Sequence, residues 1–268
     1  MNVLQVLVVY ALLGTAANSP EVNDVSSEML RPARWEIAPE FFWHRYREPG
    51  VMKNSGILYG AAASYTRYYQ PSYQKRLFRM EGEFATGEVD YDGSLMDGTP
   101  YSLEGIRDYL VNVRIVWGEL WRTKAWENQL YFGLGYRYLN DDSSFDSHGY
   151  ERQSNYLYLP LGVKTYNELG DNWYLGLGGE LDVLLIGLQI SGIAESETDS
   201  SDVENWQWPG FGVRGSVELR HRTKSLDLAV APFIQYWWID NSQESASGVW
   251  CEPRNNTLEY GLSLIWRF

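Results

Sequence analysis

The sequence predicts an all-β protein, a closed antiparallel transmembrane β-barrel of ten strands, with eight or twelve strands as alternatives. Apolar and polar residues alternate with a period of two from Arg34 onward, and tight turns alternate with longer polar connections. The third observation is an aromatic content of 15% in a chain whose mean hydropathy is −0.37. A barrel wall that is apolar outside and polar inside accounts for that combination.

Composition excludes several classes of protein. The 268 residues are 44% hydrophobic, which is enough for a folded core. The 22 basic and 35 acidic residues give a net charge of −13, and no basic stripe is present to bind a nucleic acid. No internal segment approaches the roughly 18 apolar residues of a membrane helix, so strands would have to cross the membrane. Cys251 is the single cysteine, so we expect no disulfide and no role for its thiol beyond its place in a loop.

The first residues resemble an export signal. Residues 1–20 carry no charged side chain, and the apolar stretch from Val3 to Leu13 precedes Thr15-Ala16-Ala17, where a signal peptidase could cut. The basic residues that usually begin such a signal are absent, and a short buried helix is the alternative. We therefore predict a signal peptide over 1–17, a polar lead-in over 18–33 and the barrel over 34–268.

The strands follow from the alternation. In 226–238 the odd-numbered residues are polar, small or aromatic and the even-numbered residues are mainly apolar, as expected for a strand with two different faces. The same test gives ten strands, at 34–47, 55–69, 73–90, 106–121, 127–140, 153–167, 171–189, 209–222, 225–240 and 256–268.

The connections between these strands are of two kinds. Short turns are predicted at 70–72, 122–124, 169–170 and 222–224, and longer polar connections at 48–54, 91–105, 141–152, 190–208 and 241–255. Their alternation indicates a barrel with short turns at one rim and exterior loops at the other. Strands of thirteen or more residues exceed the roughly 9–11 needed to cross a bilayer, so we expect a rim above the membrane. Trp35 and Trp43 lie near opposite ends of the first strand, as in interfacial girdles.

The last strand resembles a known signal. Tyr260, Leu262, Leu264, Trp266 and Phe268 alternate up to a terminal phenylalanine, which is similar to the C-terminal recognition signal that the assembly machinery of bacterial outer-membrane barrels reads. Ten strands with tall exterior rims resemble the omptin proteases and some ten-stranded adhesins. The resemblance implies a location in the outer membrane of a Gram-negative bacterium, with membrane lipid, lipopolysaccharide and the assembly machinery as partners. We expect a monomer.

The faces opposite the aliphatic ones are heavily charged and predict the lining of the lumen. They carry Glu36, Glu40, Glu81, Glu83, Glu180, Asp182, Glu218, Asp227 and Glu259 against Arg79, Arg114, Arg137, Lys164, Arg214, Arg220 and Arg267. Because a ten-stranded barrel is narrow, these groups are expected to neutralise one another in a plug of salt bridges. A narrow ion or proton path is the alternative. Interior glycines, among them Gly135 and Gly212, make room for large neighbours, and no GxGxxG motif opens a helix to bind a nucleotide.

Acidic residues concentrate in the exterior connections. Asp141, Asp142 and Asp146 fall together in one of them and are the candidates for a Ca²⁺ or Mg²⁺ site, which could link the barrel to anionic lipopolysaccharide. Their spacing matches no EF-hand loop, and simple solvation of the rim is the alternative. No other cofactor is predicted.

The omptins, which this chain resembles, and the barrel lipases beside them imply that catalysis would use a histidine at the rim. Asp146-Ser147-His148 is the one local grouping of acid, serine and histidine in an exterior connection, and His44 is a second candidate in the upper lumen. His221 is expected near a short turn. None of these residues matches the omptin or lipase pattern, and a mobile surface residue is the alternative account of His148.

The sequence therefore favours a structural or surface-interaction barrel with a charged, plugged lumen and acidic exterior loops. A small, porin-like diffusion channel is the first rival. A rim hydrolase, either a protease or an enzyme that modifies lipid A, is the second. A soluble secreted sandwich is the third, and extraction without detergent would identify it.

Overall fold

The computed structural model describes residues 33–69, 75–95, 98–123, 126–193, 202–244 and 251–268. The chain divides into two units, Met1–Arg31 and Pro32–Phe268, and the barrel is the second. The predicted signal peptide and the lead-in up to residue 32 lie outside the described residues. Within the described part of the chain, no helix is long and apolar enough to cross a membrane.

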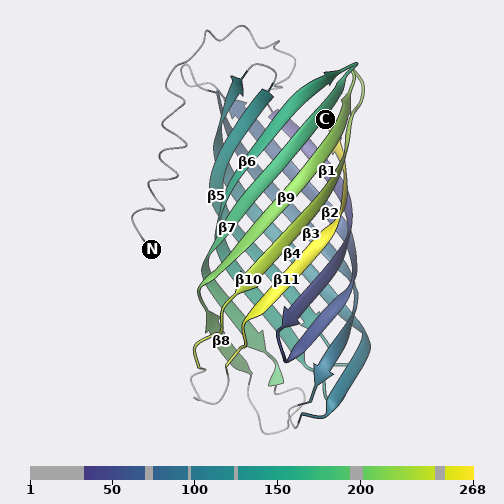
Figure 1. Ribbon diagram of the computed structural model, residues 1–268, viewed down its shortest axis with the longest axis vertical. Coiled ribbons are helices and arrows are strands. Elements are labelled where there is room, and N and C mark those ends of the chain that lie inside the picture. Colours follow the sequence, from purple (N-terminus) through teal and green to yellow (C-terminus); the bar gives the residue numbers. More distant parts are fainter. Residues whose placement is uncertain (1–32, 70–74, 96–97, 124–125, 194–201, 245–250) are drawn as a thin grey trace. The chain divides into compact units, whose positions relative to one another are not determined.

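The described residues of the barrel unit form eleven strands in sequence (Figure 1). They are β1 (Ala33–Glu48), β2 (Met52–Tyr69), β3 (Lys75–Ser94), β4 (Pro100–Thr123), β5 (Trp126–Asp142), β6 (Glu151–Gly170), β7 (Trp173–Ser191), β8 (Val203–Gln207), β9 (Gly210–Arg222), β10 (Asp227–Ile239) and β11 (Asn255–Arg267).

The sheet closes on itself through antiparallel pairs. Its order is β6-β5-β4-β3-β2-β1-β11-β10-β9-β7, and β6 pairs with β7 to complete the ring. The wall therefore has ten positions, as predicted. β8 and β9 share one of them, because both pair with β7. The C-terminal part of β7 pairs with β8, up to Gly187 and Gln207, and the rest of β7 pairs with β9, up to Val183 and Phe211. Pro209 separates the two and has no N–H to donate to the ladder.

The ten predicted strands are confirmed, but three predicted connections are wrong in extent. The connection 48–54 is only the turn 49–51, and 91–105 is largely strand, because β3 continues to Ser94 and β4 begins at Pro100. The connection 190–208 contains β8. Each extension lies beyond the apolar wall, where outward residues such as Asp90 and Asp92 are polar and the apolar alternation disappears.

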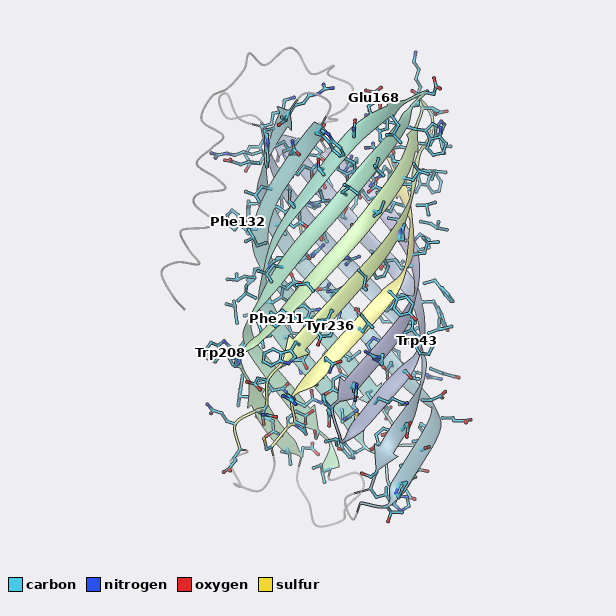
Figure 2. The ribbon with its side chains drawn as sticks, in the orientation of Figure 1. Trp43, Phe132, Glu168, Trp208, Phe211 and Tyr236 are labelled. Carbon is cyan, nitrogen blue, oxygen red and sulfur yellow. The ribbon has the colours of Figure 1, made fainter. Side chains whose placement is uncertain are left out.

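The two faces of the wall have opposite character. Outward side chains are apolar and exposed, as at Phe132 and Leu264, which are 62% and 51% exposed, whereas their inward neighbours are buried. Figure 2 shows Trp43, Trp208, Phe211 and Tyr236 in one band across the wall. This band lies toward the end that carries the longer connections, which we call the long-loop end. The opposite end, with the C-terminal strand end and the tight turns, is the short-turn end.

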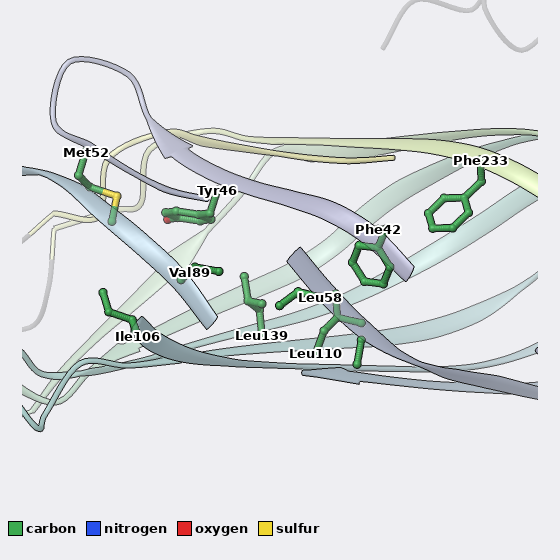
Figure 3. Packing of buried hydrophobic residues seen from close by; sticks show 10 residues of the cluster. Phe42, Tyr46, Met52, Leu58, Val89, Ile106, Leu110, Leu139 and Phe233 are labelled. Atoms are coloured by element: carbon green, nitrogen blue, oxygen red, sulfur yellow. The ribbon is translucent and has the colours of Figure 1, made fainter. Parts of the chain in front are cut away.

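Part of the lumen is apolar, which the sequence analysis did not predict. A cluster of buried side chains lines β1 to β5 in the half near the long-loop end (Figure 3), among them Phe42, Leu58, Val89 and Leu110. Phe233 of β10 packs against Phe42 with ring centroids 5.8 Å apart. The interior therefore combines an apolar lining on one side with charged groups elsewhere.

Candidate functional site

An ion pair crosses the middle of the lumen. Nη2 of Arg137 on β5 lies 2.6 Å from Oε1 of Glu259 on β11, and Nδ1 of His44 lies 2.9 Å from the same oxygen. Four positions of the wall separate β5 from β11 in either direction round the ring. The Arg137–Glu259 pair therefore joins opposite walls, and its two side chains are at most 3% exposed.

Aromatic rings fill the space beside this pair. The indole of Trp237 stacks on Tyr156 with centroids 6.4 Å apart and meets Tyr158 edge-on at 5.2 Å. The Arg137 guanidinium lies 6.0 Å from the Trp237 ring centroid. Tyr158 also donates a 2.8 Å hydrogen bond to Asn112. The lumen is thus occupied at this level by rings as well as by charges.

A second pair joins opposite walls nearer the long-loop end. Nη1 of Arg152 on β6 lies 3.0 Å from Glu48 on β1, and its Nη2 lies 2.8 Å from Asp141 on β5. The hydroxyl of Tyr46 donates to Glu48 at 3.1 Å and is 3.3 Å from Glu252, which comes from the connection between β10 and β11. Burial beside Glu48 raises the pKa of Glu252 to about 8.

Two further layers lie toward the short-turn end. Arg114 bonds Glu81, and its Nη1 lies 2.5 Å from Glu180, which also accepts a 2.6 Å hydrogen bond from Tyr131. At the last layer Arg267 pairs with Glu36 at 3.0 Å and with Glu218 at 2.7 Å. Arg79 and Arg34 supply second partners to Glu81 and Glu36.

A cavity of about 140 Å³ lies among these layers. Its polar lining includes Glu40, Glu83, Lys164 and Arg214. Ser263 donates a 2.6 Å hydrogen bond to one oxygen of Glu40, and the other oxygen is buried with no partner. The Arg214 guanidinium lies 4.9 Å from the ring of Phe233. The volume is sufficient for a few water molecules.

All sixteen residues that were predicted to line the lumen lie on the inward faces of the strands, including Asp227, which pairs with Arg220. Five more of the acidic residues form ion pairs with arginines, among them Arg114 and Arg137. These acidic residues are Glu36, Glu81, Glu180, Glu218 and Glu259. Glu40, Glu83, Lys164 and Arg214 line the cavity instead. Asp182 is 1% exposed, and neither of its carboxyl oxygens has a hydrogen-bond partner.

The predicted rim histidine does not form a relay. His148 is exposed, and its Nδ1 faces both Ser147 Oγ at 3.2 Å and Asp146 Oδ1 at 3.5 Å. A Ser-His-Asp relay needs the serine and the acid on different ring nitrogens. Tyr101 donates a 2.6 Å hydrogen bond to Asp146, which lowers the pKa of that carboxyl.

The other histidines lie away from the rim surface. His44 is fully buried in the lumen, with Glu259 on Nδ1, and is therefore out of contact with solvent. The rings of His221 and Trp173 pack together near the short-turn end, with their centroids 4.7 Å apart.

The predicted metal residues are not brought together. Asp141 points inward to Arg152, whereas Asp142 bonds Ser144 and Asp146 bonds Tyr101. No group of three or more His, Cys, Asp or Glu side chains among the described residues is arranged to hold a metal ion. Adjacent strand residues face opposite sides, which is why Asp141 and Asp142 diverge.

Sequence reasoning missed the layer at the long-loop end. Glu48, Asn54 and Arg152 lie just outside the predicted strands, whereas Asp108 lies at an inward position of the predicted strand 106–121. The available signal for Asp108 was its even number, which it shares with the inward residues Ile106 and Leu110. The residues of the predicted assembly signal, Tyr260, Leu262, Leu264, Trp266 and Phe268, all point outward and are 39–57% exposed.

No protein-family model matches the chain, and no curated protein matches its sequence. Among solved structures it is similar to the outer membrane protease OmpT from Escherichia coli, at 9% identity over 91% of this chain and 100% of that chain, with a TM-score of 0.52. A major outer membrane protein from Thermus thermophilus matches at 14% identity over 87% of this chain and 99% of that one, with a TM-score of 0.40. Ail, the attachment invasion locus protein of Yersinia pestis, matches at 8% identity over 89% and 100%, with a TM-score of 0.31. The OmpT likeness concerns fold alone, and the chain is a transmembrane β-barrel with the fold of the bacterial outer-membrane proteins.

Proposed function

We propose that this protein is a closed-lumen barrel of the Gram-negative outer membrane that acts through its exterior surface rather than by passing solutes. The Arg137–Glu259 pair carries the proposal, because it links opposite walls at a distance of 2.6 Å. The Arg152–Glu48 pair crosses the lumen at a second level. A solute would have to break both pairs to pass through.

Burial makes these pairs persistent. Separating one partner from the other leaves an uncompensated buried charge, at a cost of about 3–5 kcal/mol. The rings of Trp237 and Tyr158 occupy neighbouring space and are at most 1% exposed. Spontaneous opening wide enough for a solute is therefore rare.

The surface beyond the aromatic band suits a charged partner. Arg45, Arg47 and Lys53 point outward beyond Trp43 on β1 and β2, in a chain of net charge −13. Guanidinium and ammonium groups at this level match the phosphate groups of lipopolysaccharide. On the adjacent surface of β3, Asp92 pairs with Lys53 at 3.0 Å, and Asp90 accepts a hydrogen bond from the backbone N–H of Gly105.

Conductance in planar bilayers tests the closed lumen. We expect the wild-type protein to insert without producing conductance steps. The double variant R137A/E259A is expected to show short openings, whereas R107A, which removes an outward-facing arginine of β4, stays silent. Regular open-channel steps from the wild-type protein would contradict the proposal and favour the diffusion channel.

Thermal unfolding in detergent with added lipopolysaccharide tests the exterior surface. We expect lipopolysaccharide to raise the midpoint of the wild-type protein and to have less effect on R45Q/R47Q/K53Q. The control R67Q/R76Q/R122Q removes three arginines near the short-turn end and should respond like the wild type. Equal responses of the two triple variants would contradict the assignment of lipopolysaccharide to this surface.

A further inference from the structure

Two arginines are neighbours on the outer wall at the short-turn end. Arg67 of β2 and Arg76 of β3 are both exposed, and each has an outward position in its strand. The register pairs Arg67 with Phe78, two residues along β3 from Arg76, so the two arginines are diagonal neighbours on one face. Neighbours of this kind lie about 7–8 Å apart, within reach of long side chains. The two guanidinium groups can therefore contact one ligand between them.

The positive charge of this pair has little compensation. Nε of Arg76 lies 3.5 Å from Oε1 of Glu119 on β4, and the two side chains are 45% and 52% exposed. An ion pair as exposed as this one is weak, and it leaves the terminal nitrogens of Arg76 available to another ligand. Arg67 forms no ion pair with any described residue. Two guanidinium groups thus share one carboxylate, in a chain whose net charge is −13.

Aromatic side chains place the two arginines at the membrane surface. Tyr65 and Phe78 are the next outward residues after them, on the side away from the turn. Tyr65 packs against Trp35 with ring centroids 4.9 Å apart, and Phe78 packs against Trp117 at 5.5 Å. Tryptophan and tyrosine side chains concentrate at the level of the lipid headgroups. The arginines therefore lie level with the headgroups of the leaflet at the short-turn end.

The wall beyond these rings can accommodate an acyl chain. Met80 and Phe84 of β3 are 51% and 49% exposed, and Gly82 between them leaves a depression, because a Cβ atom there would meet nothing within 4 Å. Its cross-strand neighbour on β2 is the small Ala63. The six residues from Arg76 to Gly82 span about 20 Å along the strand, or roughly 15 Å of depth at a tilt of about 40°. This depth is half of a hydrocarbon core about 30 Å thick, so an acyl chain whose headgroup lies at the arginines reaches the depression.

We propose that Arg67 and Arg76 bind the phosphate of an anionic glycerophospholipid, such as phosphatidylglycerol, in the leaflet at the short-turn end. Guanidinium groups bind phosphate oxygens through paired, charge-assisted hydrogen bonds. A zwitterionic phospholipid carries an ammonium group beside its phosphate, and the uncompensated positive charge of the arginines disfavours it. One acyl chain of the bound lipid packs into the depression at Gly82.

This lipid differs from the lipopolysaccharide assigned to the long-loop end. The two surfaces lie at opposite ends of the barrel and share no residue, and the phospholipid site requires neither a closed lumen nor an exterior ligand. Either proposal can therefore fail while the other holds. Together they give the barrel a lipid partner in each leaflet.

Native mass spectrometry of the folded full-length chain in detergent tests the site, with phosphatidylglycerol or phosphatidylcholine of identical acyl chains as the added lipid. We expect the first phosphatidylglycerol to bind at least fivefold more tightly than phosphatidylcholine. R67Q/R76Q should abolish this preference. K75Q/R122Q is the matched control, because it removes two positive charges from the same rim at positions with the inward parity of Leu77 and Leu120, and it should bind within twofold of the wild type.

Two further variants separate a phospholipid site from general attraction to negative charge. R67K/R76K retains both charges but loses the forked guanidinium geometry, so it should bind phosphatidylglycerol less tightly than the wild type does. A63F fills the depression beside Gly82 without a change in charge and should also weaken binding. R67Q/R76Q should keep the wild-type response to lipopolysaccharide, which distinguishes this site from the exterior one. Equal binding of the two phospholipids, equal weakening by K75Q/R122Q, or displacement of the lipid by millimolar inorganic phosphate would each overturn the proposal.

Discussion

Gly212 on β9 faces the indole of Trp237 on β10, and a Cβ atom at Gly212 would lie 2.7 Å from Cε2 of that ring. The same relationship recurs between β5 and β6, where a Cβ atom at Gly135 would overlap the ring of Tyr158. The two glycines therefore make room for the two rings that meet beside the Arg137–Glu259 pair, as the sequence analysis predicted for interior glycines.

G212A should destabilise the barrel by about 1–3 kcal/mol, because the new methyl group displaces a ring that is packed on every side. G215A is the matched control on the same strand, since its Cβ would meet only Ile234 at 3.7 Å. We expect G215A to be neutral or slightly stabilising. Urea unfolding in lipid vesicles measures both, and equal effects would contradict this account of Trp237 packing.

The Arg137–Glu259 pair gives an asymmetric prediction. R137M leaves Glu259 buried with only His44 as partner and should lower the free energy of unfolding by about 3–5 kcal/mol. R137M/E259L replaces both charges by apolar groups and should be less destabilised than R137M alone. Urea unfolding of the single and double variants checks the order. Additive losses would show that the two side chains act independently.

Glu252 makes the stability of the long-loop end depend on pH. Its pKa is about 8 in the folded protein and about 4.5 when exposed, so the folded state binds more protons between these values. Its contribution to stability therefore falls as the pH rises through that window. The urea midpoint of the wild type should be lower at pH 8.5 than at pH 5.5, and E252Q should reduce this difference. An unchanged difference in E252Q would assign the effect to another group.

Two phenylalanines of equal exposure test where the membrane lies. Phe132 on the wall of β5 is 62% exposed, and Phe145 in the connection between β5 and β6 is 63% exposed. F132R should destabilise the barrel in vesicles by about 2–4 kcal/mol, the cost of a charge near the middle of a bilayer. F145R should have no such effect. Similar losses in the two variants would contradict the membrane placement.

The wall of the barrel was predictable because its period is simple. Every second residue of a membrane strand faces lipid and is apolar, so residues such as Leu262 and Leu264 reveal both the strand and its outward face. The signal ends where the strand leaves the membrane. Beyond that level Asp90 and Asp92 are polar on the outward face, and the upper parts of β3 and β4 were therefore assigned to a loop. β8 was missed for a different reason, since it has only five residues, and its outward pair, Glu204 and Trp206, is too short to show the alternation.

The charged lumen could be predicted only as a set of residues. Arg137 and Glu259 are 122 positions apart, and their contact depends on the stagger of every strand pair between them. The alternation along each strand shows that both side chains point inward, but it does not show how far along the barrel axis each one lies. The Asn54–Asp108–Asp141 group was harder still, because its members lie on three different strands and their proximity depends on the same stagger.

The two transverse ion pairs also affect how the barrel bears load. A hollow ten-stranded cylinder under the lateral pressure of a bilayer can flatten into an ellipse, since the hydrogen-bonded wall bends more readily than it stretches. Arg137–Glu259 and Arg152–Glu48 connect opposite walls and act as cross-struts at two heights. The cross-section should consequently remain close to circular when the surrounding membrane is compressed, which keeps the exterior end in one shape.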